Sequence, residues 1–215
     1  MRADSYKIAV IGGDKRQVYL ARILANRGYE VTVYGLCERV CGEGIQEAAS
    51  LKEALKGVDA AAGPVPFLRS GKLTGSYEAP DMNVETLFKG MPETAAFFAG
   101  NIPGDVRRYA AEKGLRVYDM MLDEIVSARN AVATAEGVVA EAITRSPVNL
   151  TKSRCLVLGY GRCGSVLTWL LKSFFCSVIV FEKDRIRAAE ALVLADGTAS
   201  ADELPDELSD ADFIF

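Results

Sequence analysis

Short apolar runs alternate with helical patterns along most of the 215-residue chain. The first run, 7–11, precedes apolar residues at helical spacing from Val18 to Ala25, and a second strand pattern follows at 30–34. Further strands are predicted at 58–62, 94–99 and 115–118, and helices at 50–57 and 103–113. Strands that alternate with helices are typical of a parallel, doubly wound α/β sheet. We therefore predict such a domain over residues 1–122.

A long helix is predicted next, within a connecting segment at 123–147. The stretch 123–145 contains no proline and is rich in alanine, and Ser146-Pro147 ends it. Apolar residues recur at intervals of three or four, which predicts one buried stripe formed by Ile125, Ala128, Val132, Ala135, Val139 and Ala142. Gly137 is unfavourable in a helix, so we expect another segment to pack closely on the backbone there.

The most informative stretch is 155–164, where four apolar residues run into the spacing Gly-x-Gly-x-x-Gly. A helix pattern at 165–175 and a second strand at 177–181 follow, so the glycines fall at a strand-to-helix turn. Gly159 permits the turn, Gly161 lets the backbone approach a pyrophosphate, and Gly164 lets helix and strand pack closely. This pattern predicts a dinucleotide-binding Rossmann domain over 148–215.

An acidic residue lies at the position where such a domain binds the ribose hydroxyls. Glu182 ends the second strand, 18 residues after Gly164. Its charge favours NAD, while the neighbouring Lys183 keeps NADP as the alternative. The predicted cofactor-binding residues are Gly159, Tyr160, Gly161, Arg162, Cys163, Gly164, Glu182 and Lys183.

Two loops in the first domain lie where an open α/β sheet holds its ligands, at the carboxyl ends of strands. The first, 12–16, lacks the repeated glycines of a dinucleotide clamp, so we do not expect it to bind the cofactor. Asp14 and Arg16 either bind a ligand or merely cap and flank a helix. The second loop, 63–66, is stiffened by two prolines, and 67–83 is predicted to be a long loop without periodicity. The candidate substrate-binding residues here are Gly13, Asp14, Arg16, Pro64, Val65 and Pro66.

Composition excludes several classes of function. The 25 basic and 29 acidic residues are interleaved and give a net charge of −4. This pattern does not suggest a positively charged surface for nucleic acid or anionic lipid. No run approaches the roughly 20 apolar residues of a membrane span, and no signal peptide precedes residue 7, so a cytoplasmic location is expected. The five cysteines show no disulfide framework, and Cys37-x-x-x-Cys41 in a chain without histidine does not predict a metal site.

Four motifs occur in order along the chain, at 12–16, 63–66, 130–137 and 156–164. Together they resemble the motifs of the family formed by the A subunit of dipicolinate synthase, and Thr-Ala-Glu-Gly at 134–137 is the most specific part. Thr134 and Glu136 from this motif complete the candidate substrate-binding residues. The resemblance implies NAD(P)-dependent oxidation of a dihydrodipicolinate to dipicolinate in the cytoplasm during sporulation, with the separate B subunit of dipicolinate synthase as partner. Homo-oligomerisation stays open.

Oxidation of a dihydrodipicolinate is compatible with a chain that contains no histidine. Removing hydride from a dihydropyridine yields an aromatic ring, whereas a dehydrogenase of 2-hydroxy acids usually uses a histidine base. No catalytic residue is assigned. Because 212–215 resembles the start of a fourth Rossmann strand, we expect this domain to be incomplete. The alternatives are a nucleotide-binding module without activity, either truncated or half of a split protein, and another two-domain dehydrogenase.

Overall fold

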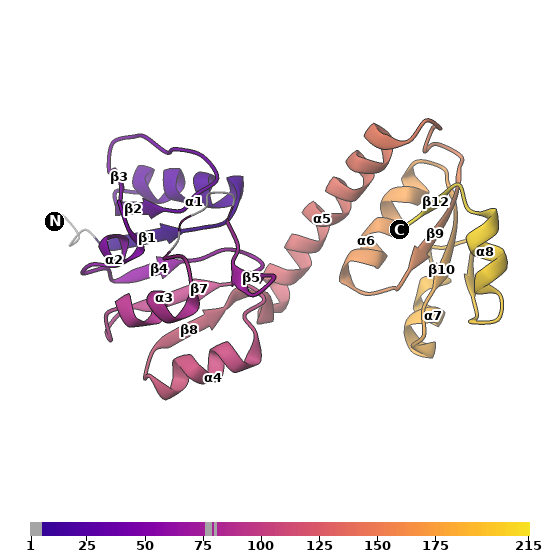
Figure 1. Cartoon of the computed structure of the whole chain (residues 1–215). Coiled ribbons are helices and arrows are strands. Elements are labelled where there is room, and N and C mark those ends of the chain that lie inside the picture. The colour runs from indigo at the N-terminus through magenta and orange to yellow at the C-terminus, as the bar shows by residue number, and fades with distance from the viewer. Residues whose placement is uncertain (1–5, 76–78, 80) are drawn as a thin grey trace. The chain divides into compact units, whose positions relative to one another are not determined.

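The computed structural model describes residues 6–75, 79 and 81–215. Four residues of the loop predicted at 67–83, namely 76–78 and 80, therefore lie outside the described residues. The chain divides into two compact units, Met1–Asp123 and Glu124–Phe215. Each contains a parallel sheet with helices, which confirms the predicted α/β class (Figure 1).

The first unit is built on a six-stranded parallel sheet in the order β3-β2-β1-β4-β7-β8. Its elements are β1 (Lys7–Ile11), α1 (Lys15–Asn26), β2 (Glu30–Tyr34), β3 (Ile45–Glu47), α2 (Leu51–Ala54), β4 (Ala60–Ala62), β5 (Leu68–Arg69), β6 (Lys72–Leu73), α3 (Val84–Gly90), β7 (Ala96–Ala99), α4 (Gly104–Glu112), β8 (Arg116–Asp119) and the 3-10 helix η1 (Met120–Leu122). The chain winds outward from β1 in one direction and then from β4 in the other. Ligands bind at the carboxyl ends of the strands at such a switch point.

The central strand of this sheet is buried on both faces. Ala9, Val10 and Ile11 of β1 have no exposed surface, because β2 and β4 pair with the strand on either side and core clusters cover both faces. Continuous apolar runs are typical of such strands. The loops that follow β1 and β4, 12–16 and 63–66, thus emerge side by side.

The segment predicted as a loop at 67–83 contains a small antiparallel hairpin. Strands β5 and β6 pair Leu68 with Leu73 and Arg69 with Lys72. Ser70 and Gly71 both have positive φ angles, 51° and 78°, as the turn of a two-residue hairpin requires. The Ser-Gly dipeptide between two leucines was the available signal, but two-residue strands are too short to show a period.

The second unit carries a four-stranded parallel sheet in the order β11-β10-β9-β12. Its elements are α5 (Glu124–Arg145), β9 (Arg154–Leu158), α6 (Arg162–Ser173), β10 (Ser177–Phe181), α7 (Arg185–Ala191), β11 (Gly197–Ala199), α8 (Leu204–Asp210) and β12 (Phe213–Ile214). Helix α5 packs along α6. None of the helices in the described part of the chain is long and apolar enough to cross a bilayer.

The stripe that α5 buries differs from the predicted one. Its buried residues recur every four positions: Ser127, Ala131, Ala135 and Val139. Ala128 is exposed, as are Ile125 (66% exposed) and Val132 (42%), so the prediction was wrong for these three. Small residues occupy the face towards α6 because they let two helices approach closely, and the apolar pattern alone could not select that face. A Cβ added to Gly137 would meet nothing within 4 Å, so the expected close packing there is also absent.

Candidate functional site

The glycine loop between β9 and α6 has the geometry of an open anion site. Gly159 adopts a φ of +104°, and its N–H donates to the carbonyl oxygen of Phe181 at 2.7 Å. Gly161 is the N-cap of α6 and offers no side-chain cap, and a Cβ on it would have nothing within 4 Å. The first N–H groups of α6 therefore face open space at the positive end of the helix dipole.

Gly164 is required by packing. A Cβ at this position would lie 2.0 Å from the carbonyl oxygen of Gly159, closer than any real contact. The residue thus lets the first turn of α6 sit against the end of β9, as the sequence spacing suggested.

Replacing Gly164 with alanine should destabilise the protein by about 1–3 kcal/mol, because the loop or the helix must shift. Urea unfolding followed by circular dichroism measures the effect. The matched control is Gly137→Ala in α5, where a Cβ meets nothing within 4 Å and the change should stabilise the helix by up to about 1 kcal/mol. Equal stability of Gly164→Ala and the parent would contradict this packing.

Glu182 lies at the end of β10 and is fixed to the glycine loop. Its carboxylate accepts hydrogen bonds from the N–H of Asp184 at 2.9 Å and from the N–H of Tyr160 at 2.7 Å. These bonds, the first contributing most, hold the pKa of Glu182 below its usual value. The side chain therefore stays ionised beside the loop. Lys183, the next residue, is exposed.

Arg162, the first residue of α6, forms an ion pair within the second unit. Its Nη2 lies 2.6 Å from Oε1 of Glu124, and its Nε donates to Oε2 of Glu124 at 3.1 Å. Both side chains are more than half exposed, so the pair contributes little to stability and is readily exchanged. Glu124 was not predicted, because nothing local in the sequence links it to a residue 38 positions away.

A cavity of about 380 Å³ adjoins the glycine loop. It is lined by the three clamp glycines, by Cys163 and by Thr134 of α5, among others. The Thr134 hydroxyl donates to the carbonyl oxygen of Asn130 at 2.8 Å. Glu136 is exposed and does not line this cavity. The structure thus brings Thr134 next to the predicted cofactor-binding residues.

The cysteines of the second unit differ sharply in accessibility. Cys163 is exposed, whereas burial, reinforced by the neighbouring Cys176, raises the pKa of Cys155 to about 12. At about pH 8 we expect iodoacetamide to modify Cys163 and to leave Cys155 intact. This pH lies far below the pKa of the Cys155 thiol, so that thiol stays protonated. Saturating NAD should slow the modification of Cys163 about tenfold by covering it.

Peptide mass spectrometry follows each cysteine separately. Exposed Cys41 of the first unit is the internal control, and its alkylation should not respond to NAD. If NAD leaves the rate at Cys163 unchanged while calorimetry shows that it binds, the cofactor does not lie over this loop.

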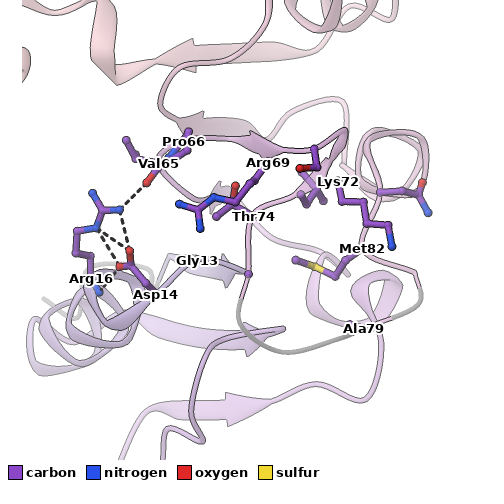
Figure 2. Close-up of a pocket in the computed structure, with 14 residues that line it drawn as sticks. Gly13, Asp14, Arg16, Val65, Pro66, Arg69, Lys72, Thr74, Ala79 and Met82 are labelled. Atoms are coloured by element: carbon purple, nitrogen blue, oxygen red, sulfur yellow. Dashed lines mark hydrogen bonds and ion pairs between the residues drawn. The ribbon is translucent and has the colours of Figure 1, made fainter.

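A second cavity, of about 690 Å³, opens in the first unit beside the loops that follow β1 and β4 (Figure 2). Five of the candidate substrate-binding residues line it: Gly13, Asp14, Arg16, Val65 and Pro66. Pro64, the sixth candidate in this unit, is buried and does not line the cavity. The Val65–Pro66 peptide is cis.

Asp14 and Arg16 join the two loops. Asp14 caps α1 by accepting the N–H of Arg16 at 2.9 Å, and its Oδ2 accepts Nη2 of Arg16 at 2.8 Å. The same Nη2 donates to the carbonyl oxygen of Val65 at 2.5 Å. The side-chain hydrogen bond from Arg16 contributes most to holding the pKa of Asp14 below its usual value. Asp14 therefore caps a helix and lines the cavity at once.

The loop after β1 is closed by the chain itself. The N–H of Gly13 donates to the carbonyl oxygen of Thr74 at 2.7 Å, and a Cβ on Gly12 would lie 2.6 Å from that oxygen. Gly12 also has a positive φ of 61°, which favours glycine. This loop thus lacks the open approach that Gly161 provides in the second unit.

Among the lining residues of this cavity that were not singled out from the sequence are three polar ones, Arg69, Lys72 and Thr74. All three belong to the β5–β6 hairpin or follow it directly. No group of three or more histidine, cysteine, aspartate or glutamate side chains in residues 6–75, 79 and 81–215 is arranged to hold a metal ion.

Comparison with known proteins adds a family match and several structural matches. The family model for the N-terminal domain of the dipicolinate synthase A subunit matches residues 7–121. The A chain of dipicolinate synthase from Bacillus subtilis is similar with a TM-score of 0.74 and 21% identity, covering 99% of this chain and 72% of that one. The A subunit of dipicolinate synthase from Bacillus halodurans has a TM-score of 0.77 and 20% identity, covering 97% and 72%.

A wider structural match points to the same fold. D-lactate dehydrogenase from Escherichia coli has a TM-score of 0.57 and 19% identity, covering 97% of this chain and 63% of that one. The comparison with curated protein sequences finds no match. At these identities the solved structures establish the fold, which is that of two-domain dehydrogenases.

Proposed function

Because the chain belongs to the family of the dipicolinate synthase A subunit, we propose that it oxidises a dihydrodipicolinate to dipicolinate with NAD(P), and with NAD in preference. The proposal includes a role in sporulation, a cytoplasmic location and the separate B subunit of dipicolinate synthase as partner. The observation that carries it is the open N-terminus of α6 at Gly161, beside the ionised carboxylate of Glu182.

The residues of the second unit fit a dinucleotide. Free N–H groups at the start of α6 suit the pyrophosphate, and the space over Gly161 admits it. Glu182 can accept hydrogen bonds from ribose hydroxyls while its backbone donors hold it in place. The bound dinucleotide supplies a hydride acceptor. Thr134 lies beside this loop and lines the same cavity.

The first unit offers a place for the substrate. Its cavity is lined by cationic side chains at the switch point of the sheet, which suits a small molecule with two carboxylates. In the reaction the dihydropyridine ring loses a hydride to NAD and a proton to the surroundings, and becomes aromatic. Much of the driving force lies in that aromaticity, so the protein chiefly binds and orients the reactants.

The test is absorbance at about 340 nm, where the reduced cofactor absorbs, with NAD, the B subunit of dipicolinate synthase and an enzymatic source of dihydrodipicolinate present. Chromatography measures the dipicolinate formed. We expect NADH and dipicolinate to appear in equal amounts, and neither to appear when this chain is omitted. Dipicolinate formed at the same rate without it would overturn the proposal. So would a chain that fails to bind either NAD or NADP in calorimetry.

A further inference from the structure

We propose that the β5–β6 hairpin builds an anion subsite in the cavity of the first unit, and that Arg69 and Lys72 select ligands with two carboxylates. The identity of the natural ligand rests on the function proposed above. The subsite itself rests on charge, strand register and an unsatisfied hydroxyl, and it can be tested without NAD.

The charges of the cavity wall leave two cations uncompensated. Among the described lining residues, the ionisable side chains are Arg16, Arg69, Lys72 and Asp14. Arg16 and Asp14 neutralise each other through their ion pair. Arg69 and Lys72 form no ion pair within the described residues, so this wall carries a net charge of about +2. A dicarboxylate would balance that charge.

Strand register places the Cα atoms of Arg69 and Lys72 next to each other. Arg69 and Lys72 are directly opposite each other in the antiparallel hairpin, so their side chains leave the same face. Like charges at such a pair disfavour the hairpin. Carboxylates bound to the two side chains would reduce that repulsion. The pairing therefore suits a bound carboxylate better than an empty surface.

The hairpin is held firmly at its base. Phe67 is fully buried, and its N–H donates to the carbonyl oxygen of Gly100 at 2.7 Å. The N–H of Thr74 donates to the carbonyl oxygen of Phe67 at 3.0 Å, and Leu73 is buried. A firmly anchored base fixes the backbone from which the two cationic side chains extend, and this limits the entropy lost when they bind a ligand.

Thr74 supplies a further polar group. Its Oγ1 is buried and has no hydrogen-bond partner in the described part of the chain, although the residue lines the cavity. Its backbone N–H and carbonyl are both engaged, so the backbone that carries this hydroxyl is held in place. In Figure 2 the side chain of Arg69 points towards Arg16 and Asp14, whereas the side chain of Lys72 points towards the opposite side of the cavity. Asp14 also feels the charge of Arg69, which helps to lower its pKa after the larger effects of Arg16.

The side-chain chemistry of Arg69, Lys72 and Arg16 gives each a different role in binding. The planar guanidinium of Arg69 can hold one carboxylate through two parallel hydrogen bonds, whereas the ammonium of Lys72 acts as a point charge. Arg16, already engaged with Asp14 and Val65, is a positioning residue that fixes the opposite wall. A ligand with one carboxylate would leave one cation of the hairpin uncompensated.

The experiment measures ligand binding to the full chain by calorimetry without NAD. The probes are dipicolinate, isophthalate, which has the same carboxylate arrangement on a benzene ring, and the monocarboxylate picolinate. The variants are Arg69→Gln, Lys72→Gln and Thr74→Val. Arg108→Gln, which removes an exposed cation of α4 outside the cavity, is the matched control.

We expect the parent to bind both dicarboxylates more tightly than picolinate. Arg69→Gln and Lys72→Gln should each weaken dicarboxylate binding about tenfold or more, with a smaller loss for Thr74→Val, while picolinate affinity changes less and Arg108→Gln binds like the parent. Circular dichroism and urea unfolding verify that each variant is folded.

The outcomes separate the subsite from the reaction. A parent that binds neither dicarboxylate, or Arg69→Gln and Lys72→Gln variants that keep the affinity and selectivity of the parent, would overturn the subsite even if NAD-linked oxidation is observed. Dicarboxylate binding that depends on Arg69 and Lys72 supports the subsite. If such binding occurs while the absorbance assay shows no oxidation, the proposed function fails and the subsite stands.

Discussion

Replacing Gly161 with valine is expected to lower the affinity for NAD at least about a hundredfold while leaving the protein folded. Gly161 caps α6 without a side chain, and the space over it is open. A branched side chain would fill the space that the pyrophosphate needs and would cover the first N–H groups of the helix. Calorimetric titration with NAD measures the loss.

The control for this variant is Gly104→Val. Gly104 is the first residue of α4, and a Cβ there also meets nothing within 4 Å, so the change places the same side chain at another open helix start. It should keep the NAD affinity of the parent. A Gly161→Val protein that binds NAD as tightly as the parent would show that the glycine loop is not the cofactor site.

The second large effect is expected at Glu182, which should set the choice between NAD and NADP. Its carboxylate can accept hydrogen bonds from the ribose hydroxyls of NAD and repels the 2′-phosphate of NADP. We expect the parent to prefer NAD about tenfold and Glu182→Arg to prefer NADP by a similar factor, since arginine removes the repulsion and binds phosphate. Dissociation constants for both cofactors measure the ratio.

Glu182 also supports the loop by accepting hydrogen bonds from the N–H groups of Tyr160 and Asp184. The experiment must therefore distinguish the effect of its charge from the effect of these hydrogen bonds. Glu182→Gln keeps the side-chain length and one acceptor oxygen but removes the charge, and it should bring the two affinities close together. A parent that prefers NADP would refute the assignment. Equal losses for both cofactors in the two variants would mean that the residue only supports the loop.

Buried parallel strands were the most predictable part of the fold. Strands β1, β2 and β10 have the bounds that the apolar runs predicted, because residues covered on both faces leave a continuous signal between polar or glycine boundaries. Strands β3 and β11 span only three residues each and lie at the sheet edges, where burial does not impose such a run.

The two cavities differ in how much the sequence could reveal. The loop at 159–164 is local, so its glycines and the cavity around them follow from one short motif. The cavity of the first unit depends on the contact between Gly13 and Thr74, which are 61 positions apart, and no periodicity brings those residues together. Arg69 and Lys72 therefore went unassigned although Asp14 and Arg16 were singled out.

The residues that cap α1 and α6 should give the N-termini of these two helices different affinities for phosphate. Both helices follow the first strand of a doubly wound sheet, yet α1 begins at Asp14, whose carboxylate already satisfies the positive helix end, while α6 begins at Gly161, which leaves that end bare. The carboxylate of Asp14 thus occupies, at α1, the place that a bound anion could take at α6. We therefore expect a dinucleotide to bind at α6 rather than at α1, so that the cavity that contains Arg69 stays available to a carboxylate ligand in the presence of the nucleotide.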